Sequence, residues 1–338
     1  MKILVIKRDK IGDLLLTTPM LQHLRQSLPQ AEIHLLANNY NAWVVAGSPY
    51  IDRLWVYRRA KTGNQLDYGA VVQQIWQQIQ LRFQRFDVVI VAGGEFSPRA
   101  VKRALGIHAK RTITYCDQSP VCTRVSDPLP APDGLHEVDR ILNLLMPLEI
   151  GKPEQIIYPQ YSLPNQWQAF AENWLVERQL SPKKYIVIGL GARRAKKQPS
   201  ADQIFRWSAY FKENFQLDTV FMWTPGKCDN PLYPGDDEVA QPVLDGEVPY
   251  IYPFRGALMP ALGLIWNART SIFPDSGLMH FAAASPGGVL GLFAETDVSP
   301  SPVQWGPRGP KVAFLEAEKS VAEINDQMVY EKLYSLLA

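Results

Sequence analysis

KILVIKRDKIGDLLLTTPMLQHLRQS, residues 2–27, is the stretch that decides the fold of this chain. The apolar run from Lys2 to Ile6 has the length and composition of a buried strand, and a segment with helical spacing follows it. Between them lies a turn that contains Gly12, where the backbone can approach a ligand closely. A strand that leads through such a turn into a helix is the unit from which α/β sheets are built.

The same alternation continues along the chain in two series. The expected strands are Lys2–Ile6, Glu32–Leu36, Leu54–Tyr57, Asp87–Ala92 and Arg111–Tyr115, then Tyr185–Leu190, Thr219–Trp223, Thr270–Phe273, Val289–Phe293 and Val312–Leu315. Helix-length segments fall between most of them, which favours mostly parallel sheets covered on both faces. Ligands of such sheets bind at the carboxyl ends of the strands. We therefore predict an α/β protein with two Rossmann-like domains that face each other across a cleft.

A chain of 338 residues exceeds the size at which one hydrophobic core stops growing, so two domains are expected. We assign residues 1–155 to an N-terminal domain and 165–319 to a C-terminal domain. The proline-bearing stretch Leu148 to Pro164 is the expected linker. Residues 320–338 are expected to form a terminal helix, for which packing back on the N-terminal domain is one arrangement.

The composition excludes several classes of protein. No stretch approaches the roughly 20 apolar residues of a membrane span, and the apolar run near the N-terminus is too short for a secretory signal, so a cytoplasmic location is expected. Three cysteines without a C-x-x-C pair argue against a disulfide framework and a cysteine-rich zinc site. A net charge of +2 is too small for a general nucleic-acid binder.

Three segments have patterns that suit chemistry, and the first is the turn from Lys7 to Asp13. Asp13 follows the first strand and is expected near the mouth of the cleft. A carboxylate in that place can take the proton from an acceptor hydroxyl that attacks a sugar carbon. The alternative is that Asp13 only caps a helix.

The second segment is Ile188 to Pro199, after the apolar strand YIVI. Gly189 and Gly191 begin like a dinucleotide fingerprint, but Arg194 stands where the third glycine belongs, so an NAD site is disfavoured. The four cations of this segment are Arg193, Arg194, Lys196 and Lys197. They suit a departing diphosphate, whose charges need paired donors, although a merely solvated run of charge is the alternative.

The third segment, Ile272 to Ala284, predicts a strand that ends at the start of a small-residue helix. The unpaired backbone amides of Ser276, Gly277 and Leu278 would point at a phosphate at the helix N-terminus. Asp275 either caps this helix or contacts a ribose hydroxyl. For His280, a structural role in a buried helix is favoured over a role as ligand or acid.

In this order, the three segments resemble the ADP-heptose:lipopolysaccharide heptosyltransferase family over nearly the full length of the chain. The matching positions are Arg8, Asp9, Ile11, Gly12, Asp13, Thr18, Pro19, Leu21, Leu24, Arg25, Pro29, Ala31 and Ile33; Lys196 and Pro199; and Asp275 to Gly277, Met279, His280, Leu292, Phe293, Thr296 and Asp297. The stretch from His136 to Leu145 also resembles the helix that closes the family's first domain.

The resemblance implies a glycosyltransferase of GT-B architecture and an inverting, metal-independent transfer, with neither a metal nor another cofactor. The implied donor is ADP-L-glycero-D-manno-heptose, a co-substrate held mainly by the C-terminal domain. By this resemblance Asp13 is the catalytic base and Lys196 binds the diphosphate of the donor. The implied turn around the ADP consists of Asp275, Ser276, Gly277, Leu278 and Met279.

Some positions depart from the family pattern. Gly191 and Ala192 replace residues that often bear hydroxyls, and Gln198 stands where an aromatic residue is common. Lys227 occupies the place of the acid that usually holds the ribose. That acid is then one of Asp236, Asp237 and Glu238, unless these form only a solvated acidic loop.

In this family the acceptor is the inner core of lipopolysaccharide, rich in carboxylate and phosphate, so cations of the N-terminal half are candidates for binding it. The candidates are Arg58, Arg59 and Lys61 in one cluster, and Arg99, Lys102 and Arg103 in another. Ordinary surface charge is the alternative for both clusters. A lipid-borne acceptor implies work as a peripheral protein at the inner face of the cytoplasmic membrane.

Two other functions stay open on the sequence. One keeps the fold and changes the sugars, giving another nucleotide-sugar transferase of surface polysaccharide synthesis, because a fold does not fix a substrate. The other is a non-catalytic protein that binds a nucleotide sugar and in which Asp13 is only structural.

Overall fold

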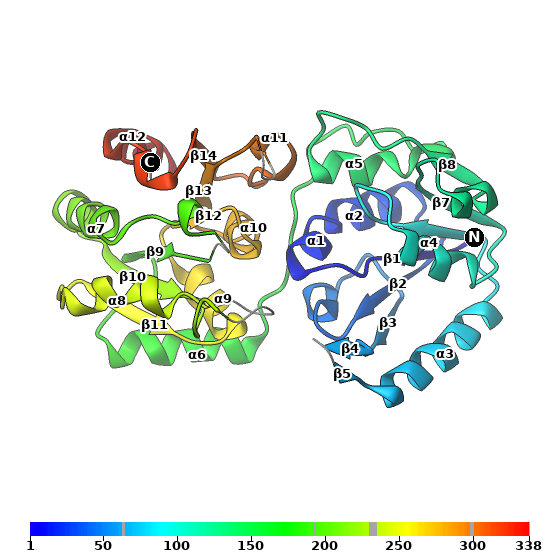
Figure 1. The fold of residues 1–338 in the computed structure, drawn as a ribbon, viewed down its shortest axis with the longest axis horizontal. Helices are drawn as coiled ribbons and strands as arrows, with labels where there is room; N and C mark the ends of the chain where they lie inside the picture. The colour runs from blue at the N-terminus through cyan, green and yellow to red at the C-terminus, as the bar shows by residue number, and fades with distance from the viewer. Residues whose placement is uncertain (63–64, 192–193, 230–234, 298–300, 338) are drawn as a thin grey trace. The chain divides into compact units, whose positions relative to one another are not determined.

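A computed structural model describes residues 1–62, 65–191, 194–229, 235–297 and 301–337 of the chain. The chain divides into two compact units, Met1–Ser162 and Leu163–Ala338, and Figure 1 shows that each unit has its own sheet with helices around it. The division falls inside the proline-bearing stretch that was expected to be the linker. Each unit is described below by itself.

The N-terminal unit contains a six-stranded parallel sheet in the order β3-β2-β1-β6-β7-β8. Its strands are β1 (Lys2–Ile6), β2 (Glu32–Asn38), β3 (Arg53–Tyr57), β6 (Val88–Val91), β7 (Arg111–Tyr115) and β8 (Asp127–Leu129). The central strand β1 pairs with β2 on one side and β6 on the other, and its residues from Ile3 onward are buried. The sequence run ILVI is apolar throughout because both faces of a central parallel strand are covered.

Helices cover this sheet. A small antiparallel pair of strands, β4 (Lys61–Thr62) and β5 (Gln65–Leu66), follows β3 in the chain. The helices are α1 (Ile11–Leu15), α2 (Thr18–Ser27), α3 (Tyr68–Phe83), α4 (Pro98–Leu105) and α5 (Glu137–Asn143). Part of the core joins side chains of β1 and β6 to Leu81 of α3 and Ala104 of α4. The helix predicted near His136 is therefore present as α5, with His136 as its N-cap.

The C-terminal unit repeats this plan with the order β11-β10-β9-β12-β13-β14, and the pairs are again parallel. Its strands are β9 (Tyr185–Gly189), β10 (Asp218–Trp223), β11 (Ile251–Arg255), β12 (Ser271–Pro274), β13 (Val289–Ala294) and β14 (Val312–Ala317). Two parallel sheets in α/β units confirm the predicted fold class of two Rossmann-like domains.

The helices of the C-terminal unit are α6 (Asn165–Glu177), α7 (Ala201–Phe215), α8 (Asp237–Asp245), α9 (Leu258–Asn267), α10 (Gly277–Ala283), α11 (Pro302–Trp305) and α12 (Asp326–Leu337). The terminal helix α12 packs into the core of its own unit through Val329 and Leu333. Asp326 at its start accepts a hydrogen bond from the indole of Trp207, at 2.7 Å. The buried face of this helix is thus used within the C-terminal unit, whereas the sequence also allows packing on the N-terminal domain.

Both sheets reverse their strand order next to a central strand. In the N-terminal unit the order runs outward from β1 on one side and from β6 on the other, and in the C-terminal unit the same happens at β9 and β12. Connections on the two sides of such a switch point diverge and leave a crevice at the carboxyl ends of the strands. The segments after these four strands are therefore where ligands are expected.

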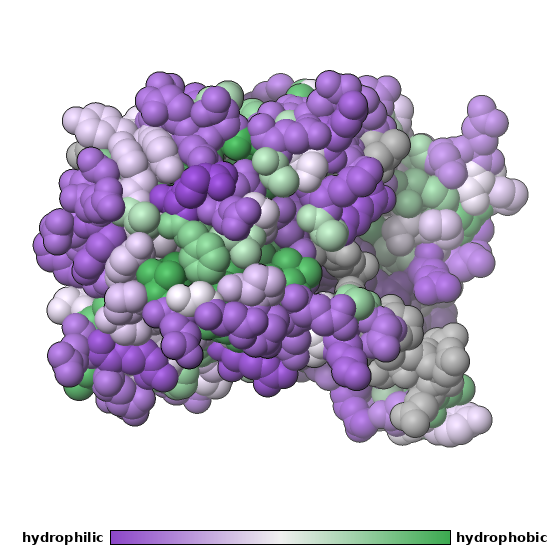
Figure 2. Space-filling model, turned by 60° about the vertical axis from the view of Figure 1, so that its left-hand side comes forward, coloured by the Kyte–Doolittle hydropathy of each residue, from purple (hydrophilic) through white to green (hydrophobic). Residues whose placement is uncertain are grey.

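The surface shown in Figure 2 is mostly hydrophilic, with a hydrophobic stretch across its middle. Among the described residues, no helix combines the length and apolar character that crossing a bilayer requires.

Candidate active site

The segment after β1 is held by two buried asparagines, Asn38 at the end of β2 and Asn41 shortly after it. The amide of Asn38 donates to the carbonyl of Arg8 at 2.7 Å, and the amide of Asn41 donates to the carbonyl of Asp9 at 3.1 Å. Both asparagines are fully buried. Because side-chain amides satisfy these carbonyls, residues 7–10 have one defined path without belonging to a helix or strand.

Lys7 is the first residue of this segment, and its side chain is only 1% exposed. Its ammonium lies 3.3 Å from the carboxylate of Asp9, which is 52% exposed. A buried lysine needs a negative partner, since an unpaired buried charge is strongly unfavourable. Lys7 and Asp9 therefore fix the turn that leads to Gly12 and Asp13.

Asp13 lies in the first turn of α1 and is partly exposed. Its Oδ2 accepts a hydrogen bond from the backbone N–H of Lys10 at 3.0 Å, which is half of a capping box. A carboxylate has two oxygens and several lone pairs, so this bond leaves acceptor capacity for a substrate hydroxyl. Asp13 has the structural role that the sequence allowed, and this role is compatible with a chemical one.

The segment after β6 lies on the other side of the N-terminal switch point. The backbone N–H of Gly94 donates to Oε1 of the buried Glu137 at 3.0 Å, and a Cβ at Gly94 would overlap this carboxylate. Arg140, one turn along α5, is also buried and reaches the carbonyl of Gly94 at 3.4 Å. The family-like helix of residues 137–143 thus positions the segment that lies across the switch point from the Asp13 turn.

Tyr57, at the end of β3, gathers two arginines. The Nε of Arg8 donates to the Tyr57 hydroxyl at 3.1 Å, and the guanidinium of Arg103 lies 4.4 Å from the centre of the Tyr57 ring. Burial and the nearby charge of Arg8 lower the pKa of Arg103. Of the predicted acceptor cations, Arg103 is therefore linked to the segment after β1, because Arg103 and Arg8 both contact Tyr57.

The other predicted acceptor cations are arranged differently. Arg58 pairs with Asp67 at 2.5 Å, and Arg59 lies over the ring of Tyr40 at 4.5 Å. Arg99 and Lys102 are exposed on α4. Lys61 begins β4, and its side chain lies outside the described residues.

In the C-terminal unit, the cationic segment follows β9 at the switch point. The ammonium of Lys196 is 65% exposed and lies 3.1 Å from Glu295, the residue after β13. Arg194 approaches the second oxygen of the same carboxylate at 3.6 Å. Arg193 and Ala192 lie outside the described residues. Two predicted diphosphate-binding cations thus share one carboxylate, Glu295.

Lys197 differs from its neighbour because its side chain is 7% exposed. Its ammonium lies 2.6 Å from Oδ2 of Asp275, the residue that follows β12. This ion pair ties the segments after β9 and β12 together across the switch point. Asp275 is accordingly the partner of a buried lysine, and the N-cap residue of α10 is Ser276 rather than Asp275.

The turn from Asp275 to Met279 begins α10 as the sequence predicted, with Ser276 as the N-cap residue. The hydroxyl oxygen of Ser276 is buried and has no hydrogen-bond partner among the described residues. Gly191, whose φ is +29°, lies opposite, since a Cβ there would be 3.4 Å from this hydroxyl. Met279 is fully buried, so it contributes packing and backbone rather than a side-chain contact.

His280 is buried in α10, and its Nδ1 has no hydrogen-bond partner among the described residues. Burial lowers the pKa of His280 to about 4, although the charge of Asp275 opposes the shift. The ring is therefore neutral at physiological pH, which agrees with the structural role favoured from the sequence.

The three acidic candidates for the ribose have separate partners. Asp236 is buried and accepts from the amide of Gln198 at 2.7 Å, and burial raises its pKa. Asp237 accepts from Arg255 and Trp223, which lower its pKa. Glu238 lies 3.4 Å from Sγ of Cys228. Of these three acids, Asp236 is bonded to the cationic segment, because Gln198 belongs to that segment.

Sequence reasoning missed Glu295, Asn38 and Asn41 as parts of these sites, and it included Lys197 only as one of four cations suited to a diphosphate. Asn38 ends β2 and Asn41 follows it, so both could have been found from the rule that strand ends gather at one edge of a sheet. Glu295 follows β13 in the same way, and its φ of +54° is unusual for a residue other than glycine.

The family model of glycosyltransferase family 9 (heptosyltransferase) matches residues 73–333, more than three quarters of the chain. The chain belongs to this family. It is therefore a glycosyltransferase, as the resemblance of its three motifs implied.

Two curated relatives of this family 9 glycosyltransferase span most of its length. Lipopolysaccharide heptosyltransferase 3 of Escherichia coli is 25% identical over 303 residues, covering 85% of this chain and 81% of the relative. A putative glycosyltransferase of Haemophilus influenzae is 22% identical over 340 residues, covering 97% and 93%.

Solved structures of similar fold include the glycosyl transferase family 9 protein from Veillonella parvula, with a TM-score of 0.83, 20% identity and coverage of 99% of this chain and 97% of that one. Escherichia coli ADP-heptose lipopolysaccharide heptosyltransferase II matches with a TM-score of 0.74 and 18% identity over 100% and 98% of the two chains. Escherichia coli heptosyltransferase WaaC with ADP matches with a TM-score of 0.74 and 15% identity over 99% and 100%. These likenesses agree with the fold of both units.

Proposed function

We propose that this family 9 glycosyltransferase transfers heptose from ADP-L-glycero-D-manno-heptose to a sugar hydroxyl of the lipopolysaccharide inner core, with inversion at the anomeric carbon. The observation that carries the proposal is the group of cations at the β9/β12 switch point, where Lys196 and Arg194 share Glu295. At the same switch point the buried hydroxyl of Ser276 has no hydrogen-bond partner among the described residues. A diphosphate offers several acceptor oxygens to such donors. The similar Escherichia coli heptosyltransferase WaaC has been solved with ADP and with ADP-2-deoxy-2-fluoro heptose, which supports a donor of this chemical class.

The reaction is a single displacement. The oxygen of the acceptor hydroxyl forms a bond to the anomeric carbon while the bond from that carbon to the ADP oxygen breaks, so the configuration inverts. Asp13 accepts the hydroxyl proton as general base. Lys196 and the first-turn amides of α10 balance the charge that gathers on the departing ADP. We propose that these groups suffice without a metal, so that transfer continues unchanged in the presence of a chelator.

Two replacements of Asp13 are needed to test its role as base, because the residue also caps α1. In Asp13→Asn the amide oxygen can still accept from Lys10, but the group no longer takes a proton, so kcat should fall by about 10²-fold to 10⁴-fold with donor affinity within a few-fold. Asp13→Ala removes the cap as well and should also lower stability by about 1 kcal/mol. Full activity in Asp13→Asn would contradict the assignment.

The product identifies the function. We expect that the purified chain, supplied with ADP-heptose and a panel of truncated core acceptors, gives one product heavier by a heptose, with ADP released only when both substrates are present. Mass spectrometry measures the product, and NMR of its anomeric proton reports inversion. Transfer from a different nucleotide sugar would favour another polysaccharide transferase, and binding without turnover would favour a non-catalytic protein.

The acceptor side of the proposal rests on the cations of the N-terminal unit. Arg103 and Arg8, gathered at Tyr57, lie at the segment after β1 that leads to Asp13. Guanidinium groups suit the carboxylate and phosphate of the inner core. Because that core is attached to lipid, we place the reaction at the inner face of the cytoplasmic membrane, with the chain as a peripheral protein.

A further inference from the structure

Helix α3 exposes a continuous stripe of large apolar side chains. Its members are Tyr68, Val72, Ile75, Trp76, Ile79 and Phe83, each 40–78% exposed. They make up six of the eighteen large apolar side chains that are exposed among the described residues. Scattered exposed apolar residues are normal on a protein surface, but a group of this kind on one helix marks an interaction site.

The six residues form one face by helical geometry. At 3.6 residues per turn they fall within an arc of about 100° around the helix axis. Ala70, Gln77 and Leu81 on the opposite side are buried and pack toward the sheet. The inner face of the helix is therefore buried against its own unit, and a second, apolar face is exposed to water. Figure 1 shows α3 at the margin of its unit, beside β3.

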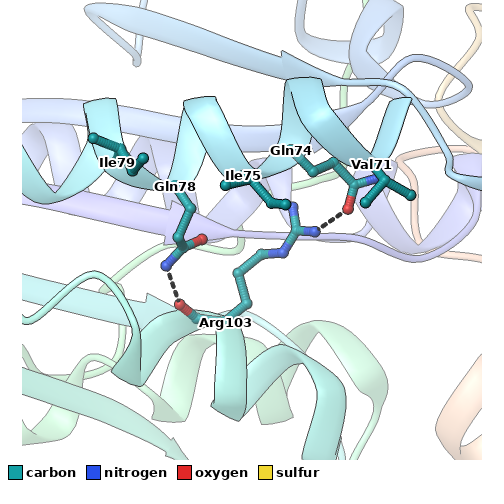
Figure 3. A pocket seen from close by; sticks show the side chains of 6 residues that line it. All are labelled: Val71, Gln74, Ile75, Gln78, Ile79 and Arg103. Carbon is teal, nitrogen blue, oxygen red and sulfur yellow. Dashed lines mark hydrogen bonds between the residues drawn. The ribbon is translucent and has the colours of Figure 1, made fainter. Parts of the chain in front are cut away.

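Helices α3 and α4 carry positive charge only, and the two acidic residues that flank α3, Asp67 and Asp87, are ion-paired with Arg58 and Lys110. Residues 68–86 and 96–106 contain no aspartate or glutamate, whereas they include Arg82, Arg85, Arg99, Lys102 and Arg103. Arg103 reaches α3 from α4, as Figure 3 shows, and its guanidinium donates to Gln74 while its carbonyl accepts from Gln78. Between the two helices lies a pocket of about 360 Å³ lined by Ile75, Ile79 and Arg103 among others.

We propose that this face of α3 docks on an anionic lipid bilayer. Tyrosine and tryptophan favour the level of the lipid head groups, isoleucine, valine and phenylalanine enter the acyl boundary, and arginines beside them attract anionic lipids. The proposal rests on the proposed function, since a lipid-borne acceptor brings the enzyme to a membrane. It adds which surface makes the contact and which lipid chemistry recognises it.

A second copy of this chain fits the face less well than a bilayer does. In a two-fold symmetric contact the same patch meets itself, so Arg82 and Arg85 of both copies would be brought close together. Like charges held together at an interface disfavour association. An anionic surface instead complements the arginines and the apolar stripe at once.

Vesicle sedimentation with the full chain tests the docking. Vesicles of phosphatidylethanolamine and phosphatidylglycerol should bind the protein at low salt, and vesicles of phosphatidylcholine should bind it much more weakly. Val72→Glu places a charge in the middle of the stripe and should lower the bound fraction by about ten-fold. The matched control is Val176→Glu on α6, a valine 75% exposed compared with 66% for Val72. It should bind as the wild type does.

Circular dichroism of both variants checks that their fold is unchanged. Absence of binding to the anionic vesicles, or equal loss in the two variants, would overturn the proposal. So would light scattering that shows a dimer which only Val72→Glu dissociates, because the stripe would then belong to a second copy. Transfer to a water-soluble core acceptor, measured alongside, tests the proposed function separately, since Val72→Glu should leave that rate unchanged.

Discussion

Glu295 holds the cations that the donor diphosphate would need, since Lys196 and Arg194 both approach its carboxylate. In the proposed donor site, ADP therefore competes with this side chain. We predict that Glu295→Gln raises the affinity for ADP by about 3-fold to 10-fold, while Lys196→Ala lowers it by a similar factor, because partly exposed ion pairs are worth about 1 kcal/mol. Isothermal titration calorimetry measures both. Lys332→Ala, in the exposed part of α12, is the control, and an unchanged affinity in Lys196→Ala would remove this lysine from the site.

His280 makes the stability of the chain depend on pH. Its pKa is about 4 in the folded protein, whereas the ordinary value for a histidine in an unfolded chain is 6.5. Between these values the unfolded chain binds a proton that the folded chain refuses, so the free energy of unfolding falls as the pH is lowered from 6.5 toward 4. From pH 7 to pH 5 this loss is about 2 kcal/mol.

We predict that His280→Phe removes this part of the pH dependence. Urea unfolding of the wild type and the variant at pH 7 and pH 5 measures it. The wild type should lose about 2 kcal/mol more than the variant between the two pH values. An equal loss in both proteins would show that His280 is not buried as a neutral ring.

The sequence predicted the residue types of the candidate sites better than their individual roles. It selected the cationic segment but preferred Lys196, and it could not reveal that Lys197 is the lysine buried against Asp275. Adjacent side chains in a short irregular turn point in different directions, and no periodicity reports those directions. Asp13 was ambiguous for a related reason, because one carboxylate can cap a helix and still face a substrate.

At the scale of elements, all the central strands and two of the four edge strands of the six-stranded sheets were predictable. β1 and β7 have the expected bounds, and the other eight expected strands are present within two residues at each end. The two-residue strands β4 and β5 were not predicted. In the six-stranded sheets, β8 and β11 were missed. Each contains a proline, Pro128 or Pro253, and each lies at the edge of its sheet, where a missing N–H is tolerated. Proline lowered the strand signal at the positions where the fold can accept it.

The end of β9 tolerates only a glycine. A Cβ at Gly189 would lie 2.0 Å from Cε1 of Phe273, which is fully buried on β12. We predict that Gly189→Ala lowers stability by about 1–3 kcal/mol, because a packed core cannot absorb the added methyl group. Thermal unfolding measures the loss, and Phe273→Leu in the same chain should restore part of it.

Gly151→Ala is the matched control for this substitution, since no atom of the described residues, chain neighbours apart, lies within 4 Å of the added Cβ. It should leave the unfolding temperature nearly unchanged. If Gly189→Ala were as mild as this control, the close approach of β9 and β12 would not be as the structure has it.

At the scale of the whole molecule, the proposed donor site belongs to one unit. Lys196, Asp275, Ser276 and Glu295 all lie within residues 163–338, which have their own sheet and core. We predict that a fragment of residues 163–338 binds ADP within a few-fold of the affinity of the full chain, and that residues 1–162 do not bind it. Calorimetry on both fragments measures this. Loss of ADP binding by a folded C-terminal fragment would show that the nucleotide also needs the N-terminal unit.

The path of the chain has a consequence for how such enzymes can acquire a new donor specificity during evolution. Within the described ranges neither sheet borrows a strand from the other unit, and the terminal helix stays with the core that precedes it. One seam near Ser162 therefore joins two self-contained halves. A recombination event at that seam could graft a donor half from a relative onto this N-terminal half without interrupting either sheet.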